Sequence, residues 1–154
     1  MRIRLNAWRV LTLTLVILAA GAIFVLTVQS PQGTMDLSVG FAGAVARAFG
    51  AGGAPDQFLV RKFGHTIEFF GLGCAIALCT IAWTDDSMRW QDRLAVAAAI
   101  CVGNSLFDQT HKLFVAGREF DVLDLPFDIA GYSLAIALVF GIWLLLRNRL
   151  PHRR

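Results

Sequence analysis

The sequence predicts an all-α, polytopic membrane protein: a four-transmembrane-helix bundle with a short interfacial helix in the first outer loop. The mean hydropathy of the 154 residues is +0.62 and only 16% of them are charged, whereas a soluble domain carries about a quarter charged residues. The apolar residues are also gathered into long runs instead of being spread at amphipathic spacing. These observations exclude a soluble enzyme, a disordered tail and a disulfide-stapled secreted module, and we expect one membrane domain over residues 1–154.

The first run contains no charge from Val10 to Val28, and its length is close to the roughly 20 residues that cross a bilayer. Three arginines precede it, as they would in a signal peptide. However, the run is longer than a typical signal-peptide h-region, and the plausible cleavage site at Ser30 is followed directly by Pro31. We therefore expect a retained span over about residues 9–28.

Three further spans are expected over about residues 63–84, 93–115 and 123–147. The third span has only 14 uncharged residues, Leu94–Phe107, so it must take length from the polar segment that follows. It is rich in alanine, and small residues let helices approach closely in lipid. This composition predicts that the third helix is the central and most enclosed one.

Arginine and lysine give the orientation, because short cytoplasmic loops are enriched in them. With both termini in the cytoplasm, nine of these residues lie inside and five outside, which predicts a multi-pass protein of the cytoplasmic (inner) membrane with both termini cytoplasmic. The first outer loop carries apolar residues at every fourth position, namely Leu37, Phe41, Val45 and Phe49. This spacing predicts a short helix, either in the outer interface or packed over the bundle as a lid.

Ionisable residues in and beside the spans gather at one membrane surface. Each costs about 2.5–3.5 kcal/mol near a helix centre and so needs a reason. In each of three segments, consecutive ionisable residues are three or four positions apart, and this spacing places them on one helix face. The sets are Arg61, His65 and Glu68; Asp108, His111 and Lys112; and Asp121, Asp124 and Asp128. In the four-span topology these faces meet in the outer third of the bundle, whereas the charges at the cytoplasmic ends are expected to be ordinary flanking residues.

Simpler explanations exist for several of these residues. Asp124 can cap the fourth helix, whose first turn suits Pro126, and Arg61 and Lys62 can be interface anchors. Asp128 is harder to explain in this way, because it faces into the span one turn past Asp124. The whole set can also be an ion-pair network that ties three helices together as a scaffold.

Two segments contain an ordered set of motifs, VRKFGHTIEFFGLG and, about 35 residues later, FDQTHKLFVAGREFDVLDLPFDIAG. A basic residue is followed by a histidine with an acid one turn on, then by an acidic, histidine-containing helix end, a Gly-Arg pair and a D-x-x-x-D-x-x-G motif. This order resembles the VanZ-like family of small membrane proteins over about Arg61–Gly131. The chain departs from the commoner form at Gln109 and Lys112, where many members have a second acid and a later glutamine. This departure argues against a mechanism that needs two adjacent acids there.

The resemblance implies functional roles for Lys62, His65, Glu68, Asp108, His111, Arg118, Asp124, Asp128 and Gly131. The family takes its name from a member associated with low-level resistance to the glycopeptide teicoplanin, although antibiotic resistance by this chain is not implied. The resemblance leaves the molecular activity of the family open.

The first functional hypothesis is an outward-facing polar site that binds or modifies an envelope amphiphile. The ligand classes are a lipid-linked wall precursor, a phospholipid headgroup and a lipoglycopeptide, and both hydrolytic and sequestering versions fit the residues. Guanidinium and ammonium groups at the mouth would hold phosphate or carboxylate, while deeper carboxyls and histidine would serve as acids or bases. The candidate catalytic residues are His65, Glu68, Asp108 and Asp128. The candidate binding residues are Arg61, Lys62, His111, Arg118 and Asp124.

Other classes are kept as alternatives. A small proton-coupled transporter would use Glu68, His65 and Asp128 as a titrating relay, but it predicts polar residues that continue toward the cytoplasm, where the spans are apolar. A structural or assembly role would use the ion-pair network as a scaffold. A metal site is disfavoured by the neighbouring cations and by the lack of an H-E-x-x-H doublet, and we expect no cofactor. The partner is the lipid bilayer, with no nucleic acid, and the oligomeric state stays open.

Overall fold

The computed structural model describes residues 6–29 and 56–149, together with residues 33, 36, 39, 40, 43 and 44. In this part of the chain all regular secondary structure is helical. The long helices are α1 (Ala7–Val28), α3 (Gln57–Trp83), α4 (Trp90–Lys112) and α5 (Asp124–Arg149). The residues on which the expected interfacial helix rests (Leu37, Phe41, Val45 and Phe49) lie outside the described residues.

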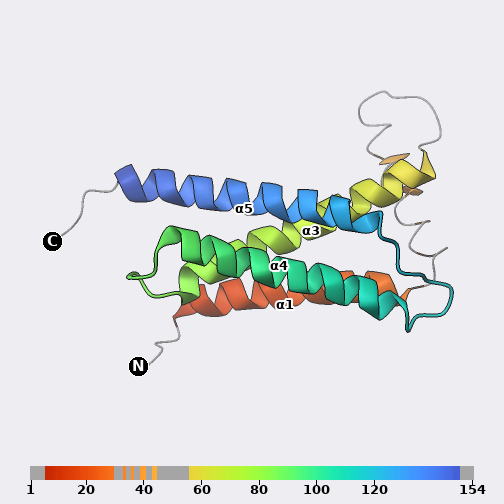
Figure 1. The fold of residues 1–154 in the computed structure, drawn as a ribbon, viewed down its shortest axis with the longest axis horizontal. Helices are drawn as coiled ribbons and strands as arrows, with labels where there is room; N and C mark the ends of the chain where they lie inside the picture. Colours follow the sequence, from red (N-terminus) through yellow and green to blue (C-terminus); the bar gives the residue numbers. More distant parts are fainter. Residues whose placement is uncertain are drawn as a thin grey trace.

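The four helices lie side by side in a bundle, each running opposite to the one before it (Figure 1). At one end, here called the terminal end, α1 begins, α3 ends, α4 begins and α5 ends. At the other end, here called the distal end, α1 ends, α3 begins, α4 ends and α5 begins. The distal end therefore collects the three segments whose polar faces the sequence predicts to meet.

Three of the helices, α1, α3 and α5, are long and apolar enough to cross a membrane. α4 has 23 residues, but it carries charged side chains near both of its ends. α4 starts at the terminal end and finishes at the distal end, so it lies alongside the other three helices (Figure 1). The predicted four-helix bundle is confirmed in its number of helices.

The helix bounds follow from local capping. The Asp56 side chain accepts a hydrogen bond from the Phe58 amide at 2.8 Å and so caps α3 at its first turn. α3 therefore starts six residues before the expected span does, and this puts Arg61 and Lys62 on helical turns. α4 ends at Lys112, short of the expected Val115.

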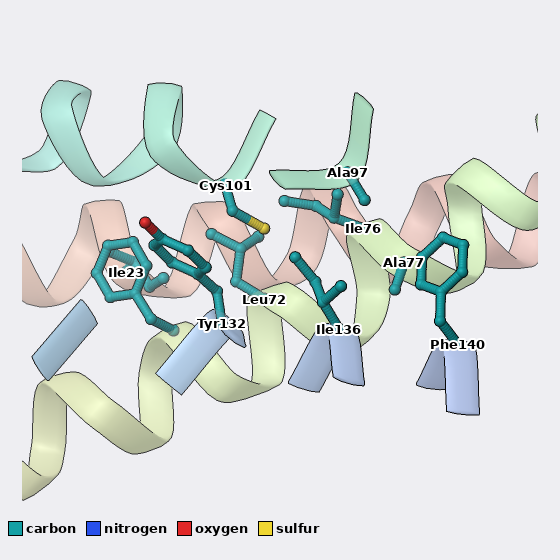
Figure 2. Packing of buried hydrophobic residues seen from close by; sticks show 10 residues of the cluster. Ile23, Leu72, Ile76, Ala77, Ala97, Cys101, Tyr132, Ile136 and Phe140 are labelled. Atoms are coloured by element: carbon teal, nitrogen blue, oxygen red, sulfur yellow. The ribbon is translucent and has the colours of Figure 1, made fainter. Parts of the chain in front are cut away.

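The apolar core draws side chains from all four helices (Figure 2). α3 makes the most extensive contacts, above all with α5. Two glycines allow this close approach. A Cβ added at Gly131 would lie 2.4 Å from the carbonyl oxygen of Thr66, and one added at Gly73 would lie 2.9 Å from the Cα of Tyr132.

The expectation that the third span is the central helix is therefore wrong, because α3 has that place. The alanines of α4 do not share one face: Ala97 is buried, whereas Ala95 and Ala99 are exposed. The buried face of α4 is instead a stripe with polar residues at both ends and small ones in the middle. It consists of Arg93, Ala97, Cys101, Ser105, Asp108, Gln109 and Lys112.

Arg93 also corrects the expectation that charges at the terminal end are ordinary flanking residues, since only 1% of it is exposed. Its guanidinium donates to the carbonyl oxygens of Ile81, Asp85 and Met88 at 3.4, 2.6 and 3.3 Å. It also lies 5.2 Å from the ring centre of Trp143. Arg93 thus satisfies carbonyls at and beyond the end of α3 that have no helical partner.

α1 is fastened to α3 at the terminal end by two hydrogen bonds between side chain and backbone. Arg9 Nε donates to the carbonyl oxygen of Ala82 at 2.8 Å, and Trp83 Nε1 donates to the carbonyl oxygen of Arg9 at 3.1 Å. These bonds fix the start of α1 against the end of α3.

Candidate functional site

The polar residues of the distal end are organised around Asp124, whose side chain is fully buried. Lys62 Nζ donates to its Oδ1 at 2.6 Å, while Lys112 Nζ and an Arg61 nitrogen donate to its Oδ2 at 3.0 and 3.1 Å. The Nε2 atom of His65 lies 3.2 Å from the same oxygen. A buried carboxylate is costly unless it is paired and hydrogen-bonded, and this one is surrounded by partners.

The helix ends place these charges where the backbone favours them. Asp124 is the first residue of α5 and Lys112 is the last of α4. A carboxylate at a helix N-terminus and a cation at a C-terminus are both stabilised by the helix dipole. Lys62 and His65 lie three positions apart on α3, so both side chains point toward Asp124.

His65 lies between two aspartates one helical turn apart. Its Nδ1 lies 3.2 Å from Asp128 Oδ1, opposite the contact with Asp124. The other oxygen of Asp128 accepts a hydrogen bond from Ser105 Oγ at 2.7 Å. Both ring nitrogens of His65 thus face carboxylates, although its Nδ1 and Asp128 Oδ1 have no hydrogen-bond partner among the described residues. His65 therefore links Asp124 and Asp128, two residues of α5 that are one helical turn apart.

Asp108 connects this cluster to α1. Its Oδ2 lies 3.1 Å from Lys112 Nζ, and its Oδ1 accepts a hydrogen bond from the hydroxyl of Thr27. Lys112 thus bridges Asp108 and Asp124. The polar network consequently includes residues from all four helices.

Asp121 closes the cluster on its outer side. Its Oδ2 accepts hydrogen bonds from Lys62 at 2.8 Å and from Arg61 at 3.0 Å, and its amide donates to Gln109 Oε1 at 3.3 Å. The hydrogen bond from Lys62 holds the pKa of Asp121 below its usual value. The Arg61 side chain is 45% exposed, so Arg61 and Asp121 form the accessible face of the network.

Glu68 differs from the other carboxyls. It lies on α3 one turn inward from His65 and is partly buried. It is close enough to interact electrostatically with His65, Asp108, Lys112 and Asp128. No described residue forms a hydrogen bond or an ion pair with it. Glu68 is therefore a hydrogen-bond acceptor without a direct partner among the described residues, whereas each aspartate of the network contacts a basic side chain.

A small pocket of about 50 Å³ lies between α1, α3 and α4. It is lined by Ala20, Ile23, Phe24, Phe69, Leu72, Asn104, Phe107, Asp108 and His111. The ring centre of His111 lies 4.6 Å from that of Phe24 and 5.9 Å from that of Phe107. The Nδ1 atom of His111 is buried without a hydrogen-bond partner among the described residues. Asp108 is shared by the pocket and the polar network.

Arg118 is directed to the end of α1. Its guanidinium donates to the carbonyl oxygens of Leu26 at 2.9 Å and of Gln29 at 3.2 and 3.3 Å, and burial lowers its pKa. The preceding Gly117 has a φ of 77°, a conformation that favours glycine. The Gly-Arg pair thus turns the chain and caps α1.

The structure brings together Arg61, Lys62, His65, Asp108, Asp124 and Asp128, with Glu68 one turn inward. Two candidate residues lie apart from this network: Arg118 at the end of α1 and His111 in the apolar pocket. Sequence reasoning missed Thr27, Ser105 and Gln109 as partners. A signal existed, because each is a polar side chain on or next to an apolar run. The described residues contain no group of three or more His, Cys, Asp or Glu that could hold a metal ion.

Comparison with known proteins adds one finding. A family model described as VanZ/LLP1 matches residues 11–146. The match extends beyond the segments that carry the polar motifs and includes most of α1 and α5. No curated protein and no solved structure matches the chain.

Proposed function

Since the chain belongs to the VanZ/LLP1 family of membrane proteins, we propose that its distal end faces outward from the cytoplasmic membrane and binds an envelope amphiphile. The ligand classes remain a lipid-linked wall precursor, a phospholipid headgroup and a lipoglycopeptide. One observation carries the proposal: Asp108 belongs both to the polar network and to the apolar pocket. An amphiphile requires polar and apolar contacts side by side, and Asp108 marks where the two meet.

The depth of the pocket supports an acyl or other apolar group as its occupant. Ala20 lies eight residues before the end of α1 at Val28, which is roughly 12 Å at 1.5 Å per residue. This depth lies within the hydrocarbon region of a bilayer about 30 Å thick. The pocket is small compared with sites for drug-sized ligands, which are about 300–1,000 Å³. It would accept part of a ligand whose remainder lies along the exposed surfaces of α1 and α4.

Binding fits the geometry better than covalent catalysis does. The hydroxyl of Ser105 donates to Asp128 and not to His65, so the described contacts do not pair this hydroxyl with the histidine that would activate it. His65, Glu68, Asp108 and Asp128 supply hydrogen-bonding groups, which suffice to bind a polar group. Modification of the ligand by acid–base chemistry is an outcome that the experiment below would detect.

A structural scaffold is the second candidate function. It is favoured because both carboxylate oxygens of Asp124 already contact basic side chains. Each lysine ammonium contacts two carboxylates, and such closed pairing is what a structural network needs. The two functions differ at Glu68, which has no partner among the described residues. Loss of its charge would weaken ligand binding but would leave a scaffold intact.

The transporter alternative lacks such support. On the buried faces of α4 and α5, between the Ser105–Asp128 pair and Arg93, the described residues are mainly small or apolar. They include Ala97, Cys101, Ala135, Ile136 and Phe140. Cys101 and the buried Tyr132 are titratable, but a proton relay would need such groups to continue as far as the terminal end, and Ala97, Ala135, Ile136 and Phe140 do not supply them.

The test compares wild-type protein with Glu68→Gln and with the control Glu119→Gln, an isosteric change at an exposed residue on the same side. The three proteins are matched for membrane level, purified in mild detergent and examined by native mass spectrometry, alongside lipid and wall-precursor profiles of the cells. We expect an amphiphile that copurifies with wild type and Glu119→Gln and is depleted from Glu68→Gln at unchanged melting temperature.

Other outcomes have defined meanings. If no amphiphile is retained, or if all three proteins retain the same species equally, the binding proposal fails. Equal amphiphile content and equal melting temperature in all three proteins would favour the scaffold, whereas a lower melting temperature for Glu68→Gln alone would show that Glu68 stabilises the fold and would contradict its role as an open acceptor. A species chemically altered only in cells with active protein would show that the ligand is modified.

A further inference from the structure

Building on the binding function proposed above, we infer that the polar group of the ligand is a hydrogen-bond-donating cation, such as a primary amine. This reverses the sequence-based expectation that the site holds phosphate or carboxylate. The reason lies in which charges of the network are already paired and which remain open toward the pocket.

The cations of the network are occupied. The Lys62 and Lys112 side chains are only 1% and 2% exposed, and each ammonium contacts two carboxylates. The guanidinium of Arg118 binds backbone carbonyls of α1. An anionic headgroup would have to displace carboxylates that are already in place, and Arg61, at the outer rim, is the partly exposed exception.

The pocket side of the network is lined instead by groups that accept hydrogen bonds. Glu68 lies four positions before Leu72, which lines the pocket, so the two share one face of α3. Glu68 is therefore one turn outward of the pocket. Asp108 and His111 reach the same pocket from α4.

His111 provides an independent indication of a ligand. Its Nδ1 is buried and has no hydrogen-bond partner among the described residues, although the atom belongs to a residue that lines the pocket. Buried polar atoms are nearly always hydrogen-bonded. The neighbouring rings of Phe24 and Phe107 present aromatic faces that attract cations.

An amine would satisfy all of these features. Its N–H groups would donate to Glu68 and to His111 Nδ1, and its charge would pair directly with a carboxylate that forms no ion pair with any described residue. Hydrogen bonds between an ammonium and a carboxylate are about twice as strong as neutral ones. The attached chain would enter the pocket beneath.

The test uses probes with the same alkyl chain and different head groups: dodecylamine, dodecyltrimethylammonium, dodecanol and dodecyl phosphate. Binding to purified wild-type protein in maltoside micelles is measured by native mass spectrometry and by the shift in melting temperature. We expect the amine to bind about tenfold more tightly than the phosphate, which corresponds to about 1.4 kcal/mol. The trimethylammonium probe should be weaker, because it has no N–H group. The preference for the amine should vanish in Glu68→Gln and persist in Glu119→Gln.

A second pair of variants tests the pocket without touching the network. Ala20→Leu fills the pocket and should weaken all four probes, whereas Ala22→Leu places the same side chain on an exposed position of α1 and should not. This pair decides the location of binding if Glu68→Gln does not fold.

The outcomes separate this inference from the proposed function. Preference for dodecyl phosphate, or dodecanol binding as tightly as the amine, would overturn the inference and leave amphiphile binding in place. Equal uptake of every probe by every variant would indicate partition into the micelle and would overturn the inference. If no probe binds and no amphiphile copurifies, the proposed function itself fails.

Discussion

The ammonium of Lys62 lies 2.6 Å from a carboxylate oxygen of Asp124, and both side chains are almost completely buried. Because Lys62 is on the second turn of α3 and Asp124 begins α5, this ion pair joins the two helices with the most extensive contacts at the end where they start. Asp124 also contacts Lys112, which connects it to α4, and His65, which adds a second contact with α3.

Removing the central charge should destabilise the bundle strongly. Asp124→Asn leaves Lys62 and Lys112 buried with fewer compensating charges, and breaking a buried pair in this way typically costs about 3–5 kcal/mol. The measurement is unfolding of the purified protein in detergent. The exposed Glu119→Gln serves as the control, and similar unfolding of the two variants would show that the Asp124 cluster contributes little to the fold.

Gly131 should tolerate no side chain. In Gly131→Ala the new methyl would lie 2.4 Å from the carbonyl oxygen of Thr66, so α3 and α5 must separate. Overpacking of this kind costs about 1–3 kcal/mol, and we expect a lower melting temperature and weaker expression. Gly141→Ala on the same helix meets no atom within 4 Å and should be neutral or slightly stabilising. Equal stability of the two variants would contradict the close approach of α3 and α5.

Arg93 should be indispensable to the terminal end. Arg93→Ala leaves the carbonyl oxygens of Ile81 and Asp85 without their side-chain donor, and loss of hydrogen bonds to a charged group costs about 1.5–3 kcal/mol each. Arg89→Ala removes an exposed pair with Asp92, which should change stability by under about 1 kcal/mol. A melting temperature for Arg93→Ala as high as that of Arg89→Ala would refute the capping role.

The stability supplied by Asp121 should depend on pH. The hydrogen bond from Lys62 lowers the pKa of Asp121 in the folded protein, so the group stabilises the fold at pH values above its unfolded pKa of about 3.9. This contribution is lost as the pH falls through the folded pKa. Wild type should therefore melt higher than Asp121→Asn near about pH 6, and the difference should shrink below about pH 4. A difference that stays constant over this range would rule out the titration of Asp121 as its source.

The number of helices and the meeting of polar faces could be predicted because both depend on local spacing. Runs of about 20 apolar residues define helices that can cross a membrane. The spacing of Arg61, His65 and Glu68 fixes a common face before any neighbour is known. In these features the sequence carries the information without reference to tertiary structure.

The partners of individual side chains could not be predicted in the same way. His111 and Lys112 lie three and four positions after Asp108, on opposite sides of it around the helix. Small differences in the rotation of α4 therefore decide which one faces α5 and which one faces α1. Arg93 was missed for a related reason, since a cation near a helix end looks like an interface anchor until the carbonyls at the end of α3 are placed beside it.

The hydrogen bonds at the two ends of α1 have a consequence for how a ligand would reach the pocket. Arg9 and Trp83 hold the start of α1, and Arg118 holds its end. Sliding of α1 along its own axis would break both sets at once. Sideways bending of its middle, where Ala20 and Phe24 face the pocket, would break neither set. Access should consequently be lateral, from the hydrocarbon phase between α1 and α4, by a bending motion that leaves the ends of α1 in register.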